Sequence, residues 1–184
     1  MASAHTSSAA SSDAVGHVTA LLTRFPEIAT IASHPATDSI VLSFVVGRRL
    51  ERPLRESIRE AVADHVRTLL AGSGDEPQSL EVTCELDGGL TFFRIVRDAL
   101  TMTREELAML TSLFAERFGK ALVKSPVDDD LLDEDRAADD ARVEYALDAL
   151  RDSAQQKSLV GFHEEKRVVV YFLKRRKKAK AAAR

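Results

Sequence analysis

Residues Ser79–Val123, SLEVTCELDGGLTFFRIVRDALTMTREELAMLTSLFAERFGKALV, decide the fold of this chain. Apolar and polar residues alternate at the start of the stretch, which is the period-two pattern of a half-buried strand. The apolar members of this pattern are Leu80, Val82, Cys84 and Leu86. Asp87-Gly88-Gly89 tolerates positive φ and therefore predicts a tight reversal into a second strand, LTFFRIVRD.

A long helix is expected after this hairpin, beginning at Thr103. Thr103 and Glu106 match a capping box, in which each side chain accepts a hydrogen bond from the other residue's backbone N–H. Apolar residues then recur at helical spacing along one face, at Leu107, Leu110, Phe114, Phe118 and Ala121. The stretch therefore predicts a strand–strand–helix unit over residues 79–123.

The same order of elements is predicted earlier in the chain, over residues 28–70. Strands are expected at 28–33 and 39–46, joined by a turn through 34–38. Pro53 suits the first turn of a helix, and Gly72-Ser73-Gly74 should end it. The apolar face of this helix comprises Leu54, Ile58, Val62, Val66 and Leu69. Two such units predict one antiparallel sheet with both helices on one face.

The remaining segments complete a single α+β domain over residues 13–173, with a mainly antiparallel sheet of about six strands from three hairpins. In chain order we expect a disordered Ser/Ala-rich tail at 1–12, a short helix from Asp13 to Phe25, an acidic linker at 126–137, a helix at 137–153, a third hairpin at 158–173 and a basic disordered tail at 174–184.

Several strands carry apolar residues on both faces, whereas an antiparallel sheet with one solvated face alternates cleanly. In the strand expected at 39–46, Val41 and Val45 lie on the face opposite to the other apolar residues of the strand. The helix at 137–153, a second copy of the chain, or a different partner would cover the second face. The order helix, hairpin, helix, hairpin, helix is similar to secretion-chaperone-like folds, which dimerise and bind protein segments; the likeness is one of element order only. The alternative function is a homodimeric protein-binding adaptor or chaperone-like regulator that uses the apolar second face of the sheet.

Charge is segregated along the chain, although the net charge is only −3 and the pI is about 6.0. Asp128–Asp140 holds eight acids against one base, and Lys174–Arg184 holds seven bases and no acid. Closely spaced cations neutralise phosphates and release counterions. We therefore predict a non-enzymatic binding module that contacts RNA, DNA or the ribosome; a tail that only aids solubility is the alternative. The predicted contacts are Lys174, Arg175, Arg176, Lys177, Lys178 and Lys180.

Candidate groups for catalysis are few and scattered. Cys84 is the single cysteine, which excludes an intrachain disulfide and a multi-cysteine metal cluster. His34, Asp38, His65 and His163 belong to no known catalytic motif, and no phosphate-cradling glycine loop occurs. The sequence favours a protein that is not an enzyme, with no cofactor and no metal. It also lacks an apolar run near the ~18 residues of a membrane span, so we expect a cytoplasmic location without membrane contact.

Overall fold

The computed structural model describes residues 6–125, 133–151, 157–165 and 167–173, and it is an α+β fold as predicted. Its elements, in chain order, are α1 (Thr6–Arg24), β1 (Thr30–His34), β2 (Ser39–Val46), α2 (Arg52–Ser73), β3 (Leu80–Asp87), β4 (Leu90–Asp98), α3 (Arg104–Phe118), β5 (Leu122–Val123), α4 (Asp133–Arg151), β6 (Leu159–Glu164) and β7 (Arg167–Phe172).

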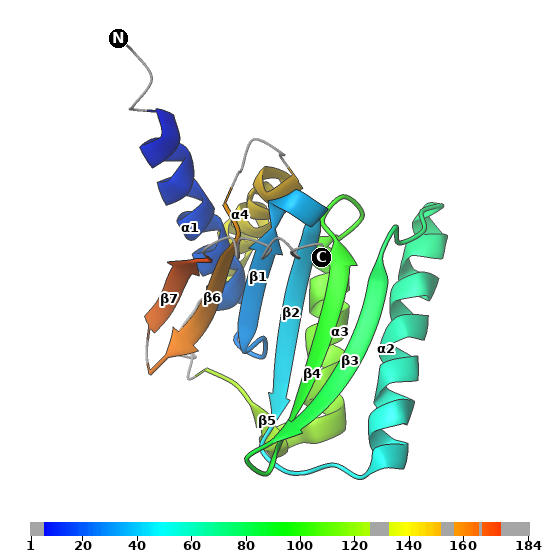
Figure 1. Cartoon of the computed structure of the whole chain (residues 1–184). Coiled ribbons are helices and arrows are strands. Elements are labelled where there is room, and N and C mark those ends of the chain that lie inside the picture. The colour runs from blue at the N-terminus through cyan, green and yellow to red at the C-terminus, as the bar shows by residue number, and fades with distance from the viewer. Residues whose placement is uncertain (1–5, 126–132, 152–156, 166, 174–184) are drawn as a thin grey trace, which may run out of the picture.

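The strands form one antiparallel sheet in the order β3-β4-β2-β1-β6-β7 (Figure 1). Three hairpins build it, namely β1–β2, β3–β4 and β6–β7, which confirms the predicted composition. The C-terminal hairpin joins the sheet through β6, which pairs with β1. The short β5 pairs with Val45 and Val46 at the end of β2, where β1 no longer runs alongside it.

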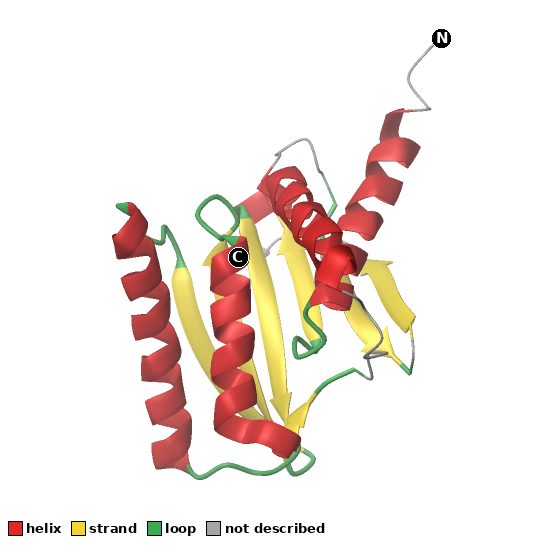
Figure 2. Cartoon of the chain, turned by 180° about the vertical axis from the view of Figure 1, so that it is seen from behind, coloured by secondary structure: helices red, strands yellow, loops and turns green. Residues whose placement is uncertain are grey.

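The four α-helices of the described residues, α1 to α4, lie on the same face of the sheet (Figure 2). The last helix, α4, packs against α1 and α3. Asp140 on α4 fixes this position, because its carboxylate pairs with Arg24 of α1 at 3.0 Å and with Arg104 of α3 at 2.6 Å. The helix expected at 137–153 therefore does not cover the second face of the sheet, which was one of the three covers considered.

Local sequence patterns predicted most of the turns and helix caps. Gly88 and Gly89 have φ of +54° and +83°, which is the backbone that the Asp-Gly-Gly turn predicted. The Thr103 hydroxyl accepts a hydrogen bond from the Glu106 backbone N–H at 3.1 Å, so the N-cap half of the capping box is confirmed. The Glu106 carboxylate instead binds Arg97, so the reciprocal half is absent. Gly119, at φ +49°, ends α3 at Phe118, earlier than expected.

Two helices extend further than expected. α1 begins at Thr6 and therefore runs into the segment 1–12 for which disorder was predicted. Alanine has the best helix propensity, and extending an existing helix costs much less than nucleating one. α4 begins at Asp133, inside the predicted linker 126–137, and its first turn contains three acids, where the helix dipole favours negative charge.

An aromatic cluster forms the centre of the core between the sheet and α3. Phe44 of β2 stacks on Phe114 of α3 with ring centroids 4.0 Å apart. Phe93 of β4 meets the same Phe114 ring edge-on at 5.3 Å, and Phe118 packs beside both. The stripe predicted for α3 is thus confirmed by the buried positions of its large apolar residues.

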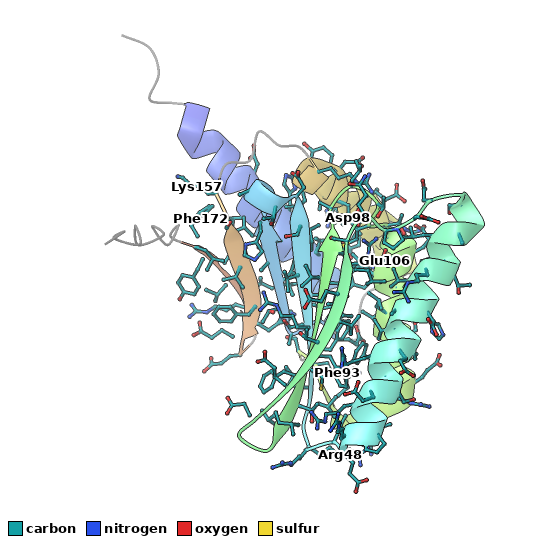
Figure 3. The ribbon with its side chains drawn as sticks, turned by 45° about the vertical axis from the view of Figure 1, so that its right-hand side comes forward. Arg48, Phe93, Asp98, Glu106, Lys157 and Phe172 are labelled. Atoms are coloured by element: carbon teal, nitrogen blue, oxygen red, sulfur yellow. The ribbon has the colours of Figure 1, made fainter. Side chains whose placement is uncertain are left out.

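A buried ionic cluster closes the end of the sheet where β4 leads into α3 (Figure 3). Arg97 donates to Glu106, Asp98, the Thr101 hydroxyl and the Ser79 carbonyl oxygen, and its side chain is not exposed. Burial acts to raise the pKa of Asp98, but hydrogen bonds from Thr101 and Ser79 and the charge of Arg97 lower it to about 2. The cluster joins the start of β3, the end of β4 and the start of α3.

Candidate binding surfaces

The cationic residues predicted to contact nucleic acid, Lys174, Arg175, Arg176, Lys177, Lys178 and Lys180, lie outside the described residues. The chain is described as far as Leu173, whose backbone N–H donates to the Ser158 carbonyl oxygen at 2.7 Å at the end of the β6–β7 hairpin. Since β7 is an edge strand, the basic segment continues from the edge of the sheet.

The face of the sheet opposite the helices, which we call the open face, lies towards the viewer in Figure 1. None of the described helices or strands covers it. The strand registers place on it Ala32, Val41, Val45, Phe92, Val96, Val123, Val160, Phe162, Val169 and Tyr171. Val41 lies at the centre of the sheet, and the neighbouring strands cover it so that only 5% of it is exposed.

Adjacent phenylalanines on β4 illustrate the two-sided burial that the sequence predicted. Phe93 points into the core and is not exposed, whereas Phe92 lies on the open face and is half-buried. On β6 and β7, Phe162 and Tyr171 stack on the open face with ring centroids 5.8 Å apart, and Tyr171 is 56% exposed. Aromatic groups at a solvated surface are enriched in protein interfaces.

Charged residues are confined mainly to the edges of the open face. β3 contributes Glu81, Glu85 and Asp87, and the β6–β7 turn contributes an ion pair between Glu164 and Arg167 at 2.6 Å. Arg94 is the charged residue nearest the centre. An apolar centre with a polar rim is the usual composition of a surface that binds another protein.

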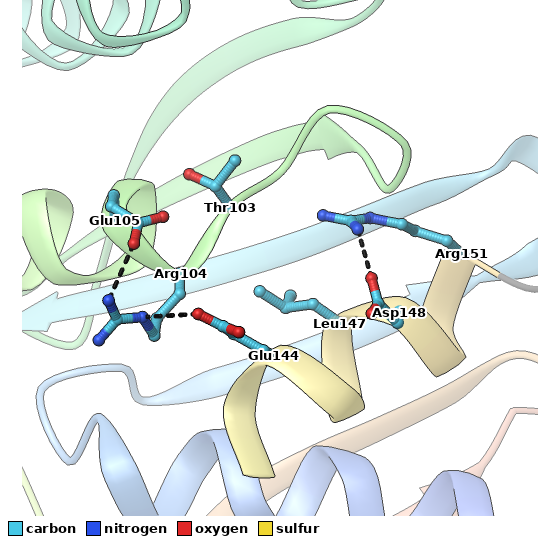
Figure 4. Close-up of a pocket in the computed structure, with 7 residues that line it drawn as sticks. All are labelled: Thr103, Arg104, Glu105, Glu144, Leu147, Asp148 and Arg151. Atoms are coloured by element: carbon cyan, nitrogen blue, oxygen red, sulfur yellow. Dashed lines mark hydrogen bonds and ion pairs between the residues drawn. The ribbon is translucent and has the colours of Figure 1, made fainter. Parts of the chain in front are cut away.

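A small polar pocket lies between the start of α3 and α4 (Figure 4). Its cations are already engaged, since Arg104 pairs with Glu105 at 2.9 Å and with Glu144 at 3.4 Å. Arg151 pairs with Asp148 and also donates to two backbone carbonyls of the β4–α3 loop. These groups hold α4 on α3, which leaves the pocket without a free charge for a ligand.

The groups considered for catalysis lie on separate elements. Cys84 is half-buried on β3, and burial raises the pKa of its thiol, which disfavours the thiolate nucleophile. Nδ1 of His65 lies 2.7 Å from the Ala61 carbonyl oxygen within α2. Burial lowers the pKa of His163. The pKa of His34 is also lowered, mainly by burial and to a smaller extent by the charge of Arg94. Across the described ranges, no three His, Cys, Asp or Glu side chains converge as a metal site.

His34 and Asp38 flank the β1–β2 turn, which local hydrogen bonds close. The Asp38 backbone N–H donates to the Pro35 carbonyl oxygen at 3.3 Å, and the Thr37 hydroxyl donates to the His34 carbonyl oxygen. Asp38 adopts φ of +45° here, a conformation that Asp tolerates better than most residues.

None of the described helices is long and apolar enough to span a membrane. No family model matches the chain, and neither the curated proteins nor the solved structures contain a significant match. The class that the fold defines is an α+β protein whose mainly antiparallel sheet carries its described helices on one face.

Proposed function

We propose that this protein is a non-enzymatic binding module that forms a homodimer through the open face. The observation that carries the proposal is an apolar sheet face, rimmed by charge, that no described element covers. Exposed apolar surface of this kind is removed from water when two sheets pack face to face. As a homodimer it would serve as a protein-binding adaptor or chaperone-like regulator in the cytoplasm.

Charge favours a second copy as the occupant of this face. One edge of the sheet, β3, carries three acids, and the other edge, β7, continues into seven bases. A two-fold axis parallel to the strands would set β3 of one copy over β7 of the other, so that opposite charges meet. Two-fold dimers are the commonest oligomers, and their interfaces are self-complementary in this way.

The oligomeric state tests this proposal directly. Sedimentation of the full-length protein should give a dimer that persists at high salt, because burial of apolar surface is not screened. The variant Phe162→Asp/Tyr171→Asp should sediment as a folded monomer. Tyr145→Asp is the matched control, because Tyr145 is 69% exposed but lies on α4 and away from the open face. A monomeric wild-type protein, or a variant that still dimerises, would contradict the proposal.

A second candidate function is the binding of RNA, DNA or the ribosome through Lys174–Lys180. Its support is the run of seven bases without an acid that follows Leu173. Full-length protein and a 1–173 truncation should be compared in pull-downs from lysate at low and high salt. Nucleic acid that accompanies only the full-length protein, and is released by salt, supports this function. Equal recovery with both proteins argues against it.

A further inference from the structure

Six exposed cations gather at the end of the sheet where β2 and α3 finish. We call this surface the basic pole; it comprises Arg48, Arg49, Arg52, Arg117, Lys120 and Lys124. Figure 3 shows Arg48 at the end of the molecule opposite the buried cluster of Asp98 and Glu106. None of the ion pairs between described residues includes a member of the pole. Residues 48–52 and 116–124 contain two acids against these six bases, which leaves +4, or +3 when Asp87 of the β3–β4 turn is added.

The two segments that form the pole are held side by side by backbone contacts. The Gly47 N–H donates to the Ala121 carbonyl oxygen at 2.6 Å, and β5 pairs with the end of β2. The buried Thr91 hydroxyl accepts from the Leu50 N–H at 3.0 Å and donates to the Arg48 carbonyl oxygen at 2.8 Å. The loop that presents the arginines is therefore fixed in advance, which reduces the entropy lost when a ligand binds.

The stability of α2 does not explain the arginines of the pole. α2 begins at Arg52, and a helix N-terminus carries a partial positive charge that disfavours nearby cations. The first turn contains no acid, and the side chain of Glu51 makes no capping hydrogen bond. Arg48, Arg49 and Arg52 therefore add positive charge where the helix is already positive. A bound anion would offset this unfavourable charge.

We propose that the basic pole binds the phosphate backbone of a nucleic acid. Four of its six cations are arginines, whose planar guanidinium donates two parallel hydrogen bonds to a phosphate. A protein partner is less suited to the pole. The only exposed large apolar residue in these described segments is Val123, which faces the open face, whereas protein interfaces are built around apolar and aromatic centres. The pole offers no aromatic side chain for base stacking, so its binding is independent of base sequence.

The pole is distinct from the basic segment after Leu173. β2 ends at the pole, and the successive antiparallel pairings of β1, β6 and β7 make β7 run away from it. The inference shares its ligand class with the second candidate function, but it depends on neither Lys174–Lys180 nor the dimer. Separate variants of the pole and of the C-terminal segment therefore distinguish the two.

Fluorescence anisotropy with a short mixed-sequence duplex DNA and a single-stranded RNA tests the pole. The variant Arg48→Glu/Arg49→Glu/Arg52→Glu should weaken binding at low salt by tenfold or more, on the order of the loss of several phosphate contacts. The slope of log affinity against log salt should become shallower by roughly 2 to 3. The 1–173 truncation, which keeps the pole, should retain salt-dependent binding.

A triple variant with the same change of charge is the control. Arg67, Arg142 and Arg167 are exposed and paired with neighbouring acids, and Arg67→Glu/Arg142→Glu/Arg167→Glu should bind as the wild type does. Thermal unfolding should show the pole variant folded and no less stable, because glutamate suits the start of α2. The proposal is overturned if the full-length pole variant binds normally, if the control loses as much affinity, or if the wild type binds anionic vesicles but neither nucleic acid.

Discussion

Arg97 on β4 and Glu106 on α3 form a bidentate ion pair, with Nε–Oε1 at 2.7 Å and Nη2–Oε2 at 3.0 Å, and neither side chain is exposed. Charges buried in this way stay ionised only because each satisfies the other, together with the hydrogen bonds from Arg97 to Ser79 and Thr101. The pair therefore fixes the position of α3 on the sheet, and its loss should be costly.

Glu106→Ala should destabilise the protein by about 3–5 kcal/mol, because it leaves the Arg97 charge buried without its partner. Urea unfolding at neutral pH measures the change. The double variant Arg97→Met/Glu106→Leu should recover a large part of the loss, since it removes both charges. Glu105→Ala, at the exposed neighbouring position, should change stability by less than about 0.5 kcal/mol. Equal stability of Glu106→Ala and Glu105→Ala would contradict the role given to the pair.

Asp98 should make stability depend on acidic pH. Its pKa is about 2 in the folded protein, against an ordinary value of 3.8, and its side chain is 7% exposed. The stabilisation is therefore present above about pH 4 and is lost as the pH falls towards 2. It amounts to about 2 kcal/mol. Asp98→Asn should be less stable than the wild type by about this amount at pH 7, and the gap should close by pH 2. A gap that is constant over this range would refute the assignment.

Gly161 on β6 is required by the close approach of α1. A Cβ there would lie 2.5 Å from Val18 Cγ1 and 3.0 Å from Leu22 Cδ1. Gly161→Ala should destabilise the protein by about 1–3 kcal/mol, measured by urea unfolding. Adding Val18→Ala should relieve part of this loss. Gly72→Ala on α2 is the control, because nothing lies within 4 Å of its added Cβ; this change should stabilise the helix by about 0.5–1 kcal/mol.

Thr91 should matter for the loop that presents the arginines of the basic pole. Thr91→Val removes two hydrogen bonds. One of them is from the backbone N–H of the buried Leu50, which is left without its acceptor. The expected cost is about 1–3 kcal/mol of unfolding free energy. Thr91→Ser keeps the hydroxyl and should restore most of the stability. Equal losses for both substitutions would show that the methyl group, and not the hydroxyl, is what matters.

Sequence patterns predicted the elements whose determinants are local. β2 occupies the predicted residues 39–46, and α2 ends near Gly74, whose φ of +79° suits a helix C-terminus. Alternation, helical spacing and glycine turns depend on neighbours within a few residues, so the sequence displays them directly.

Pairings between distant segments were not predicted. Nothing in residues 30–34 or 159–164 indicates that β1 and β6 are neighbours, because β pairing depends on packing across the whole sheet. Glu106 matched a capping box, yet its carboxylate binds Arg97, since a buried guanidinium needs a partner more than the backbone N–H of the half-buried Thr103 does. Each half of the basic pole is a short segment that does not stand out in the sequence. Arg48-Arg49 is a pair of adjacent cations, but only the β2–β5 pairing places it beside Lys120.

The position of α1 also has a consequence for biosynthesis. Its main packing partners are α4, β6 and β7, all near the other end of the chain, and it contacts the neighbouring β1 much less. A ribosome synthesises Leu22 well before His163, and at the usual rates of elongation the interval is roughly seven to thirty seconds. Throughout that time the apolar side of the nascent α1 lacks most of its native cover. The first helix to emerge is therefore among the last to be completed, and the growing chain is most exposed to aggregation and to chaperones at its N-terminal end.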